Sequence, residues 1–386
     1  MKRIRIVLIC ECPVDVRIVD ALSELYNVTI LTRKHLRNTF VNWEPKQIDG
    51  IKVLLLPASR LLTFPSVFLW LCRSVKDYDL ILISGADLGA LGAILARYLI
   101  GKPVLLLVCK LSDEYFVCRA KKKIASKIFH RTISPSLKLL RIINVKFSDG
   151  VIGLGEYLAK HMNKYSNKVF TIPIYGVNST LYRPVPLSKK IDIRRALKLP
   201  KNAYTIFFSS RISPEKDSEC LIRSFKILLN KRNNITLMNL SGGYRDFQSI
   251  ANEYNVGDKV IARPPVDPRI DLPLYYQASD LCVQCSKAEG LGLSPLEALA
   301  CGIPVIATAV GGLKYTVIPG ETGLLVSVGS SQKLAEAIEF AIRHPEEMHK
   351  MAKRGRKMVC TRYEAENAFY DLDVVIKRLT RTPEGH

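Results

Sequence analysis

The sequence predicts an α/β protein made of two doubly wound, parallel-sheet domains. Short runs of β-branched residues and leucine alternate along the chain with amphipathic helical patterns, which is typical of buried parallel strands joined by helices. The chain has 386 residues, about twice the usual size of one domain. A segment rich in proline and then in charge, residues 182–190, interrupts the alternation. Two domains are therefore expected to meet near residue 185.

The strands are expected in two sets. Seven precede the interruption: Ile6–Leu8, Val28–Leu31, Val53–Leu56, Leu80–Ser84, Val104–Val108, Val151–Gly153 and Val169–Ile172. Five follow it: Thr205–Phe208, Thr236–Leu240, Leu281–Gln284, Val305–Thr308 and Leu324–Val326. We expect domains at residues 1–184 and 185–362, and a helix within 363–386 that packs back on the first domain. Ligands of such folds bind outside the carboxyl ends of the strands, so the chemistry is expected there.

The charge of the chain predicts anionic partners. Lysine and arginine total 57 against 35 aspartate and glutamate, a net charge of +22. Between Glu114 and Asp149 there is no acid, but nine bases are interleaved with isoleucine and leucine at roughly helical spacing. Residues 119–146 are expected to form a basic amphipathic stretch that contacts an anionic membrane; the alternative is a solvated helix face packed on the sheet. Nucleic acid is not expected, because the stretch has little aromatic interleaving and no recognised nucleic-acid-binding motif.

The same sequence predicts a cytoplasmic location. The apolar run at Ile4–Cys10 is interrupted by Arg5 and is better read as a strand than as a signal peptide. The longest weakly charged stretch, residues 88–108, contains two bases and a proline, which disfavours a membrane-spanning helix. Ten scattered cysteines then indicate reduced thiols. We expect a cytoplasmic protein. If the basic stretch binds lipid, the protein lies on the cytoplasmic face of the membrane.

The most informative segment is residues 286–305. Ser294, Pro295 and Glu297 have the spacing of an N-cap, a first-turn proline and a capping box, so a helix is expected to begin at residue 295. The loop Gly290–Leu293 leaves backbone amides at the positive end of that helix, which suits a diphosphate. Glu289 stands at the start of this loop, and nothing in capping requires it. The structural alternative is that Glu297 only caps and the glycines only turn.

A second cluster follows the expected strand Thr205–Phe208. Arg211 and Lys216 lie in the loop between that strand and an amphipathic helix, at the end of the sheet where ligands bind. A guanidinium and an ammonium there suit a departing diphosphate, the first as a fork and the second as a point charge. By itself such a pair usually lies on a solvated surface. The glutamate motif in the same domain makes a binding role of the pair more plausible.

Together these motifs resemble the retaining, nucleotide-sugar-dependent glycosyltransferases of the GT-B fold, family 4. Glu289 and Glu297 form the E-x7-E pattern of that family, and Arg211 and Lys216 match its G-R-x4-K element. Residues 149–160, 172–184 and 311–326 are similar to further landmarks, so the resemblance covers essentially the whole chain. It implies two Rossmann-like domains facing each other across a cleft, the first binding the acceptor and the second the nucleotide sugar.

The resemblance also implies roles for individual residues. Arg211 and Lys216 would neutralise the leaving nucleoside diphosphate, and Glu289 would hold the transferred sugar. The donor-binding positions would be Glu297, Gly290, Leu291, Gly292, Leu293, Ser294 and, after another strand, Gly242. The implied reaction moves a hexose-type sugar, with retention, to a lipid-linked, glycan or other hydroxyl acceptor, with the nucleotide sugar as co-substrate and no further cofactor.

Several positions depart from the family pattern. Ser210 stands where the family has glycine before the arginine, Cys109 and Lys110 stand where it has a histidine, and Tyr315 where it has a glutamate. The N-terminal loop, 10–17, lacks the usual glycines, and its Asp15 and Arg17 are candidates for the acceptor side.

No essential metal is expected. Cys282 and Cys285 are a CxxC without a second pair, which indicates small buried thiols rather than zinc ligands. The two D-x-D patterns, 77–79 and 371–373, precede a strand and lie in the last helix, away from any expected sugar site. Two other classes stay open: a nucleotide-sugar enzyme of the same fold with another reaction, such as an epimerase, and a basic nucleic-acid-binding protein.

Overall fold

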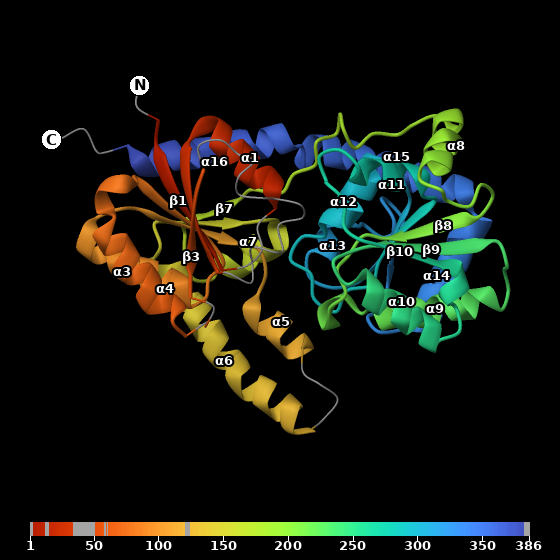
Figure 1. Cartoon of the computed structure of the whole chain (residues 1–386), viewed down its shortest axis with the longest axis horizontal. Helices are drawn as coiled ribbons and strands as arrows, with labels where there is room; N and C mark the ends of the chain where they lie inside the picture. Colours follow the sequence, from red (N-terminus) through yellow and green to blue (C-terminus); the bar gives the residue numbers. More distant parts are fainter. Residues whose placement is uncertain are drawn as a thin grey trace. The chain divides into compact units, whose positions relative to one another are not determined.

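The computed structural model describes residues 3–11, 15–33, 51–57, 59, 61–119 and 124–381. These residues form two compact units (Figure 1). The first unit contains the described residues up to Tyr175 together with those from Glu366 onward, and the second is Gly176–Ala365. The α/β class and the two parallel sheets predicted from the sequence are confirmed.

The first unit is built on a seven-stranded parallel sheet with the order β3-β2-β1-β4-β5-β6-β7. Its strands are β1 Arg5–Cys10, β2 Asn27–Arg33, β3 Lys52–Leu56, β4 Leu80–Ser84, β5 Val104–Val108, β6 Gly150–Gly153 and β7 Val169–Thr171. β4 and β5 are buried along their whole length because helices cover both faces of the sheet. The strand order reverses between β1 and β4, which is where a doubly wound sheet opens its ligand crevice.

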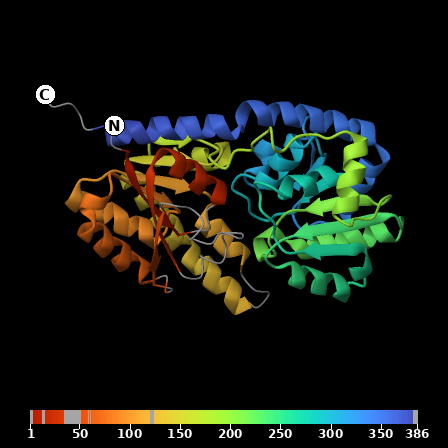
Figure 2. The same cartoon turned by 45° about the horizontal axis from the view of Figure 1, so that its top comes forward.

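Helices lie on both faces of this sheet (Figures 1 and 2). α3, α4 and α6 cover one face, and α1 and α16 lie on the other. Tyr26, at the end of α1, hydrogen-bonds to Asp373 of α16, which joins the last helix to this unit. The helices are α1 Val16–Leu25, α3 Thr63–Arg73, α4 Leu88–Ile100, α5 Ser112–Cys118, α6 Ile124–Phe147, α7 Glu156–Met162 and α16 Ala365–Thr380.

The second unit is built on a six-stranded parallel sheet with the order β10-β9-β8-β11-β12-β13. Its strands are β8 Tyr204–Phe208, β9 Ile235–Leu240, β10 Val260–Arg263, β11 Leu281–Gln284, β12 Val305–Thr308 and β13 Leu324–Val326. Here the order reverses between β8 and β11. β10 was not expected from the sequence, because it has only four residues, it is an edge strand, and a short 3₁₀ turn at Gly257–Lys259 runs directly into it.

The helices of the second unit again form two layers. α9, α10 and α14 cover one face of the sheet, and α8, α11, α12 and α15 cover the other (Figure 1). Phe225 of α9, Phe247 of α10 and Ile338 of α14 are fully buried against the strands. The bounds are α8 Leu187–Ala196, α9 Ser218–Leu229, α10 Tyr244–Glu253, α11 Leu272–Ala278, α12 Leu293–Ala300, α13 Leu313–Thr316, α14 Ser331–Arg343 and α15 Pro345–Arg362.

The segment before the proline-rich linker belongs with the second unit. The backbone N–H of Val177 donates to the carbonyl of Tyr363 at 2.7 Å, and Val177 forms a parallel bridge with Glu364. These bonds hold residues from 176 onward against the end of α15, so the observed division falls earlier in the chain than residue 185.

Candidate active site

The candidate site residues of the second unit lie in loops that leave the carboxyl ends of neighbouring strands. Arg211 and Lys216 follow β8, Gly242 follows β9, and the segment from Glu289 follows β11. β8 and β11 are adjacent in the sheet and flank the point where the strand order reverses. The fold therefore brings together, at the usual ligand position of such a sheet, residues that are about eighty positions apart in the sequence.

Lys216 and Glu289 form the centre of the cluster. The Lys216 ammonium lies 2.5 Å from Oε2 of Glu289, and both side chains are largely buried, with exposed fractions of 15% and 11%. Lys216 ends a short 3₁₀ turn, Pro214–Lys216, and its own backbone carbonyl accepts a bond from the Cys285 thiol. The lysine is thus held from both ends, which fixes the direction of its charge.

Glu289 has one oxygen saturated and one available. Besides Lys216, Oε2 accepts hydrogen bonds from the hydroxyl of Ser286 at 3.1 Å and the amide of Gln284 at 3.3 Å. Oε1 accepts no hydrogen bond within the part of the chain that the structure describes. The carboxylate is therefore oriented by three donors through one oxygen, while the other can accept from a ligand hydroxyl.

Ser210 supports this arrangement. Its hydroxyl donates to Oε1 of Gln284 at 3.0 Å, and this bond turns the amide nitrogen of Gln284 toward Ser286 and Glu289. The serine that replaces the family's glycine thus has a structural partner. Sequence reasoning missed Gln284, because a single glutamine at the end of a buried strand belongs to no motif. The only signal for a site residue was a polar side chain at the carboxyl end of an apolar strand, β11.

The loop from Gly290 to Gly292 presents free backbone donors. Among the described residues, no backbone hydrogen bond is donated by the N–H groups of these three positions, which directly precede α12. Gly292 has φ +92°, and a Cβ there would stand 2.7 Å from a methyl carbon of Leu313, so only glycine fits. Leu293 then begins the helix. Unpaired N–H groups at a helix N-terminus are a suitable site for phosphate or sugar oxygens.

The expected capping box is wrong. α12 begins at Leu293 with Gly292 as its N-cap, two residues before the expected start, so Ser294 and Glu297 lie inside the helix. The Ser294 hydroxyl donates instead to the carbonyl of Ser209 at 2.6 Å, across to the loop after β8. The physical reason is the left-handed conformation of Gly292, which ends the loop earlier than the serine and proline alone would.

Glu297 is buried in the helix layer, with an exposed fraction of 2%. The hydroxyl of Tyr276 donates to its Oε2 at 2.8 Å. Burial raises the pKa of the Cys282 thiol above its ordinary value, and the charge of Glu297 raises it further. The structure places Glu297 in the second turn of α12, beyond the loop amides that precede this helix.

Arg211 and Gly242 lie at the rim of the cluster. The Arg211 side chain is 46% exposed and pairs with Glu215 of its own loop at 2.7 Å. A Cβ on Gly242 would meet nothing within 4 Å, so this position faces open space.

The two acceptor-side candidates belong to the first unit. Asp15 is the N-cap of α1 and accepts from the backbone N–H of Arg17 at 3.0 Å, and the two side chains also form an ion pair at 2.7 Å. These contacts lie at the start of the helix and give Asp15 a capping role that sequence reasoning missed.

The signals set aside in the sequence have structural explanations. Cys282 and Cys285 are completely buried free thiols, as predicted. Asp79 pairs with Arg5, and Asp373 with Lys377 and Tyr26. Within the described ranges, no group of three or more histidine, cysteine, aspartate or glutamate residues is arranged to hold a metal ion.

The fold resembles solved glycosyltransferases over nearly the whole chain. Sucrose-phosphate synthase from Thermosynechococcus elongatus superposes with a TM-score of 0.77 at 24% identity, covering 98% of this chain and 99% of that one. HepE of Anabaena in complex with UDP gives a TM-score of 0.76 at 18% identity, covering 97% and 100%. The chain therefore has the GT-B fold.

A family model matches most of the second unit. Residues 189–358 match the family model described as glycosyl transferases group 1, and this range includes the whole cluster around Glu289. This part of the chain is therefore similar to group 1 glycosyltransferase domains.

Curated relatives match over part of their length. A D-inositol 3-phosphate glycosyltransferase of Arthrobacter sp. (strain FB24) is 30% identical over 194 residues, 49% of this chain and 45% of the relative. A D-inositol 3-phosphate glycosyltransferase of Corynebacterium aurimucosum is 29% identical over 260 residues, 63% of this chain and 62% of the relative. The chain thus matches about half the length of these relatives.

Proposed function

We propose that this protein is a retaining glycosyltransferase of family 4 that transfers a hexose-type sugar from a nucleotide sugar to a hydroxyl acceptor. The observation that carries the proposal is the Lys216–Glu289 pair at the start of the loop of free amides before α12. It places a fixed cation, an available carboxylate oxygen and backbone donors at one position. A sugar diphosphate needs these three groups. The UDP-glucose complex of the structural neighbour HepE supports a nucleotide-sugar donor.

Each group has a chemical task in the proposed reaction. The anomeric carbon becomes oxocarbenium-like as the C–O bond to the diphosphate breaks, and the diphosphate gains negative charge. Lys216, Arg211 and the amides of 290–292 stabilise that charge more strongly in the transition state than in the ground state. Glu289 accepts from a hydroxyl of the transferred sugar through Oε1. Glu297 accepts from the ribose hydroxyls.

We also propose that the reaction proceeds with retention, as the family resemblance implies, and without a metal ion. The acceptor oxygen attacks the face from which the diphosphate leaves and passes its proton to a phosphate oxygen, so the sugar keeps its configuration and no protein nucleophile is required. The positive charge that a divalent cation supplies in other transferases comes here from two side chains and a helix N-terminus.

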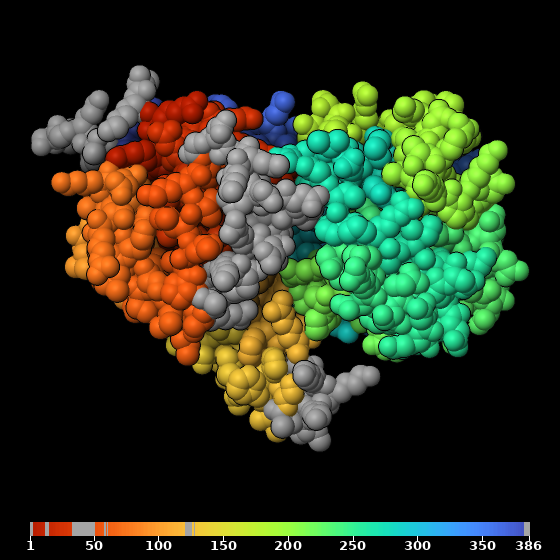
Figure 3. Space-filling model, in the orientation of Figure 1, coloured from red at the N-terminus to blue at the C-terminus, as the bar shows by residue number. Residues whose placement is uncertain are grey.

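We further propose that the protein lies on an anionic membrane surface through α6. Four large apolar side chains of this helix are exposed by 43–58%: Ile128, Phe129, Leu139 and Phe147. Arg131, Lys138 and Lys146 are exposed on the same helix, which protrudes from the first unit in yellow in Figure 3. Apolar and basic side chains together suit the interface of a bilayer.

One of the nine bases does not contribute to this surface. Arg141 is 4% exposed and pairs with Asp113 of α5, so its charge is structural. Lys121, Lys122 and Lys123 lie outside the described residues. In the described part of the chain no helix is long and apolar enough to cross a bilayer.

The donor proposal is tested by nucleotide diphosphate release from UDP-, GDP- and ADP-sugars, without acceptor and with EDTA present. We expect slow release from one donor class. Glu289→Gln keeps the shape and Lys216→Met keeps the length of the side chain, and each should lower release at least 100-fold. Lys353→Met, an exposed lysine on α15, is the matched control and should not change it. Failure to release or to bind any donor saturably contradicts the proposal.

The membrane proposal is tested by co-sedimentation with vesicles of phosphatidylglycerol and of phosphatidylcholine. Binding should require the anionic lipid, decrease with salt, and weaken in Phe129→Ser and in Lys138→Gln. Equal binding to both vesicle types, or none, contradicts a membrane contact through α6.

A further inference from the structure

The helices α3 and α4 of the first unit present an apolar surface to solvent. A helix on the surface of a soluble protein normally has a polar outer face, and a helix that is apolar all round is normally buried. Arg97 is the only charged residue of α4, and three of its large side chains are nevertheless exposed by 42–71%. On α3, Arg73 is the only charged residue, and a leucine is 48% exposed. These four residues are called the α3–α4 face: Leu69, Leu95, Tyr98 and Leu99.

The α3–α4 face continues into the exposed side of α6. A Cβ on Gly92 of α4 would stand 2.7 Å from the carbonyl oxygen of Phe64, so α3 and α4 are in close contact. At the other side of α4, Arg97 forms an ion pair with Asp149, just after the end of α6. The three helices lie together on one face of the sheet (Figures 1 and 2). Their outer side chains therefore form one continuous surface.

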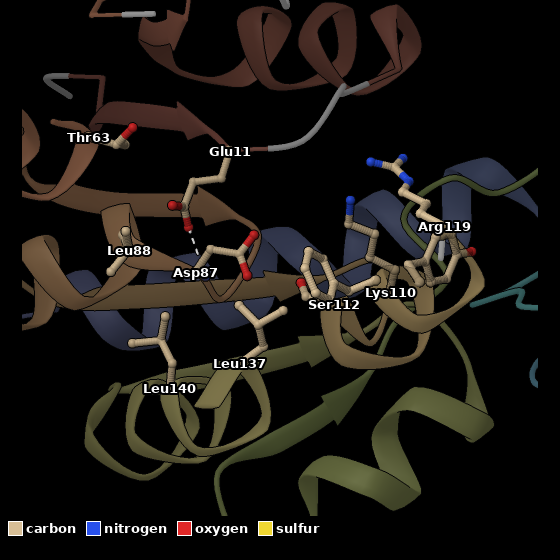
Figure 4. A pocket seen from close by; sticks show the side chains of 11 residues that line it. Glu11, Thr63, Asp87, Leu88, Lys110, Ser112, Arg119, Leu137 and Leu140 are labelled. Atoms are coloured by element: carbon tan, nitrogen blue, oxygen red, sulfur yellow. Dashed lines mark hydrogen bonds between the residues drawn. The ribbon is translucent and has the colours of Figure 1, made fainter. Parts of the chain in front are cut away.

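The inner side of this helix layer is fixed to the sheet around a cavity (Figure 4). Glu11, which follows β1, accepts hydrogen bonds from backbone N–H groups at the start of α4, those of Asp87, Gly89 and Ala90. All three helices contribute side chains to the cavity wall: Thr63 of α3, Leu88 of α4, and Leu137 and Leu140 of α6. The layer is thus held from within, and its outer side is left for a further contact.

The charges of the helix layer favour an anionic lipid surface. The sequences of α3, α4 and α6 contain no aspartate or glutamate. Exposed bases stand on α3 and α6: Arg73, Lys138 and Lys146. An apolar surface next to bases, without an acid, suits acyl chains beneath anionic headgroups.

The chemistry of the α3–α4 face fits lipid better than it fits a second copy of the chain. Protein interfaces have about one hydrogen bond per 100–200 Å², which requires polar groups on both sides. The Tyr98 hydroxyl is the only polar side-chain group among the four residues of this face. A tyrosine with an apolar ring and a polar tip is also typical of the boundary between acyl chains and headgroups.

The length of α4 limits how it can contact a bilayer. α4 has 13 residues, so at about 1.5 Å per residue it is about 20 Å long. The hydrocarbon core of a bilayer is about 30 Å thick. The helix can therefore lie in the interface but cannot cross it.

We propose that the α3–α4 face inserts into the interface of an anionic bilayer, beside α6. This inference rests on the proposed membrane contact through α6 and extends that contact to the whole helix layer. Because the layer covers one face of the sheet, the strands of the first unit then run along the membrane. The carboxyl ends of β1, β4 and β5, where such a sheet binds ligands, open alongside the bilayer and not away from it.

Co-sedimentation with vesicles measures the contribution of the face. The vesicles contain phosphatidylcholine and phosphatidylglycerol, and the salt concentration is high enough to weaken the contribution of the bases. Leu99→Ser should lower the partition coefficient of the full chain about five-fold, and Leu95→Ser together with Leu99→Ser should lower it further. Leu187→Ser is the matched control: this leucine of the second unit is 73% exposed, against 71% for Leu99, and its loss should not change binding.

Fluorescence shows whether the face enters the lipid. Leu99→Trp adds a fluorophore to the face, and Leu187→Trp adds one to the control position. With brominated phosphatidylcholine in the vesicles, the emission added by Leu99→Trp should be quenched, whereas the emission added by Leu187→Trp should not. The unmodified chain supplies the background emission.

The outcomes separate this inference from the two proposals before it. If Phe129→Ser weakens vesicle binding but Leu99→Ser does not, and Leu99→Trp is not quenched, only the insertion of the α3–α4 face is wrong. If no vesicle binds, the contact through α6 is wrong as well. A dimer in sedimentation velocity that Leu99→Ser dissociates would make the face a contact between two copies and overturn the inference. Donor hydrolysis should be equal in all these variants, so the transferase proposal is tested independently.

Discussion

Gly312→Ala is the sharpest test of the loop that holds Glu289. The N–H of Gly312 donates to the carbonyl of Glu289 at 2.9 Å, so the turn after β12 lies directly against this loop. A Cβ on Gly312 would stand 2.2 Å from the carbonyl oxygen of Gly290 and 2.8 Å from the Cα of Leu291. Ordinary C···O contact is about 3.3 Å, so the loop must move by roughly 1 Å.

That movement has a predictable cost. A displacement of about 1 Å in a reacting group can lower the rate about 100-fold, and overpacking lowers the free energy of unfolding by about 1–3 kcal/mol. Because domains are usually stable by about 5–15 kcal/mol, the variant should remain folded at 25 °C. We therefore expect donor hydrolysis to fall about 100-fold in kcat/KM with only a modest loss in urea unfolding.

Gly329→Ala is the matched control. Its new methyl group meets nothing within 4 Å, although φ is +73° there, so it adds backbone strain without touching the loop. It should lower the stability slightly and leave turnover unchanged. If Gly312→Ala hydrolyses donor within about three-fold of the unmodified rate, the close contact of Gly312 with the loop does not fix the position of Glu289.

Three further predictions concern other parts of the two units. Tyr276→Phe leaves the buried Glu297 without its phenolic donor, so the free energy of unfolding in urea should fall by about 1–3 kcal/mol and the KM for the nucleotide sugar should rise. If neither the free energy of unfolding nor the KM changes, this hydrogen bond is unimportant. Ser210→Ala removes the hydrogen bond that orients the Gln284 amide, so turnover should fall about ten-fold while stability changes little. Ser210→Thr should recover part of the lost turnover. Full activity of Ser210→Ala would exclude a role of Ser210 in orienting Gln284. Because the pKa of Glu11 is raised to about 8, the folded state binds its proton more tightly than the unfolded chain, and stability should fall as the pH rises from about 4.5 to about 8, by at most about 1.4 kcal/mol per pH unit. Glu11→Gln should flatten this slope in urea unfolding at pH 5.5 to 8.5, and an identical slope in both proteins contradicts the assignment.

The strands could be predicted because each is a short apolar run bounded by polar residues. The twelve expected strands are all present, and the missing one, β10, is a four-residue edge strand that ends in a partly exposed Arg263. Edge strands lack the continuous apolar signal of buried ones, since they are covered less completely.

The individual site residues were predictable only where a motif spans them. Lys216 and Glu289 could be paired through the family pattern, but their distance depends on β8 lying beside β11. The role of Glu11 could not be predicted, because its partners are backbone N–H groups at Asp87, Gly89 and Ala90, and backbone groups leave no trace in a sequence.

The bonds between the loops after β8 and β11 also say when the site can form during folding. Besides the Lys216–Glu289 pair, the hydroxyl of Ser294 binds the carbonyl of Ser209, and the N–H of Lys287 binds the carbonyl of Glu215 at 2.7 Å. Every one of these bonds joins segments on either side of the intervening β9, α10 and β10. A chain that has emerged only as far as β10 therefore lacks the proposed donor site. Recovery of nucleotide binding after dilution from denaturant should therefore coincide with docking of β11 beside β8. It should occur later than the first formation of helical structure.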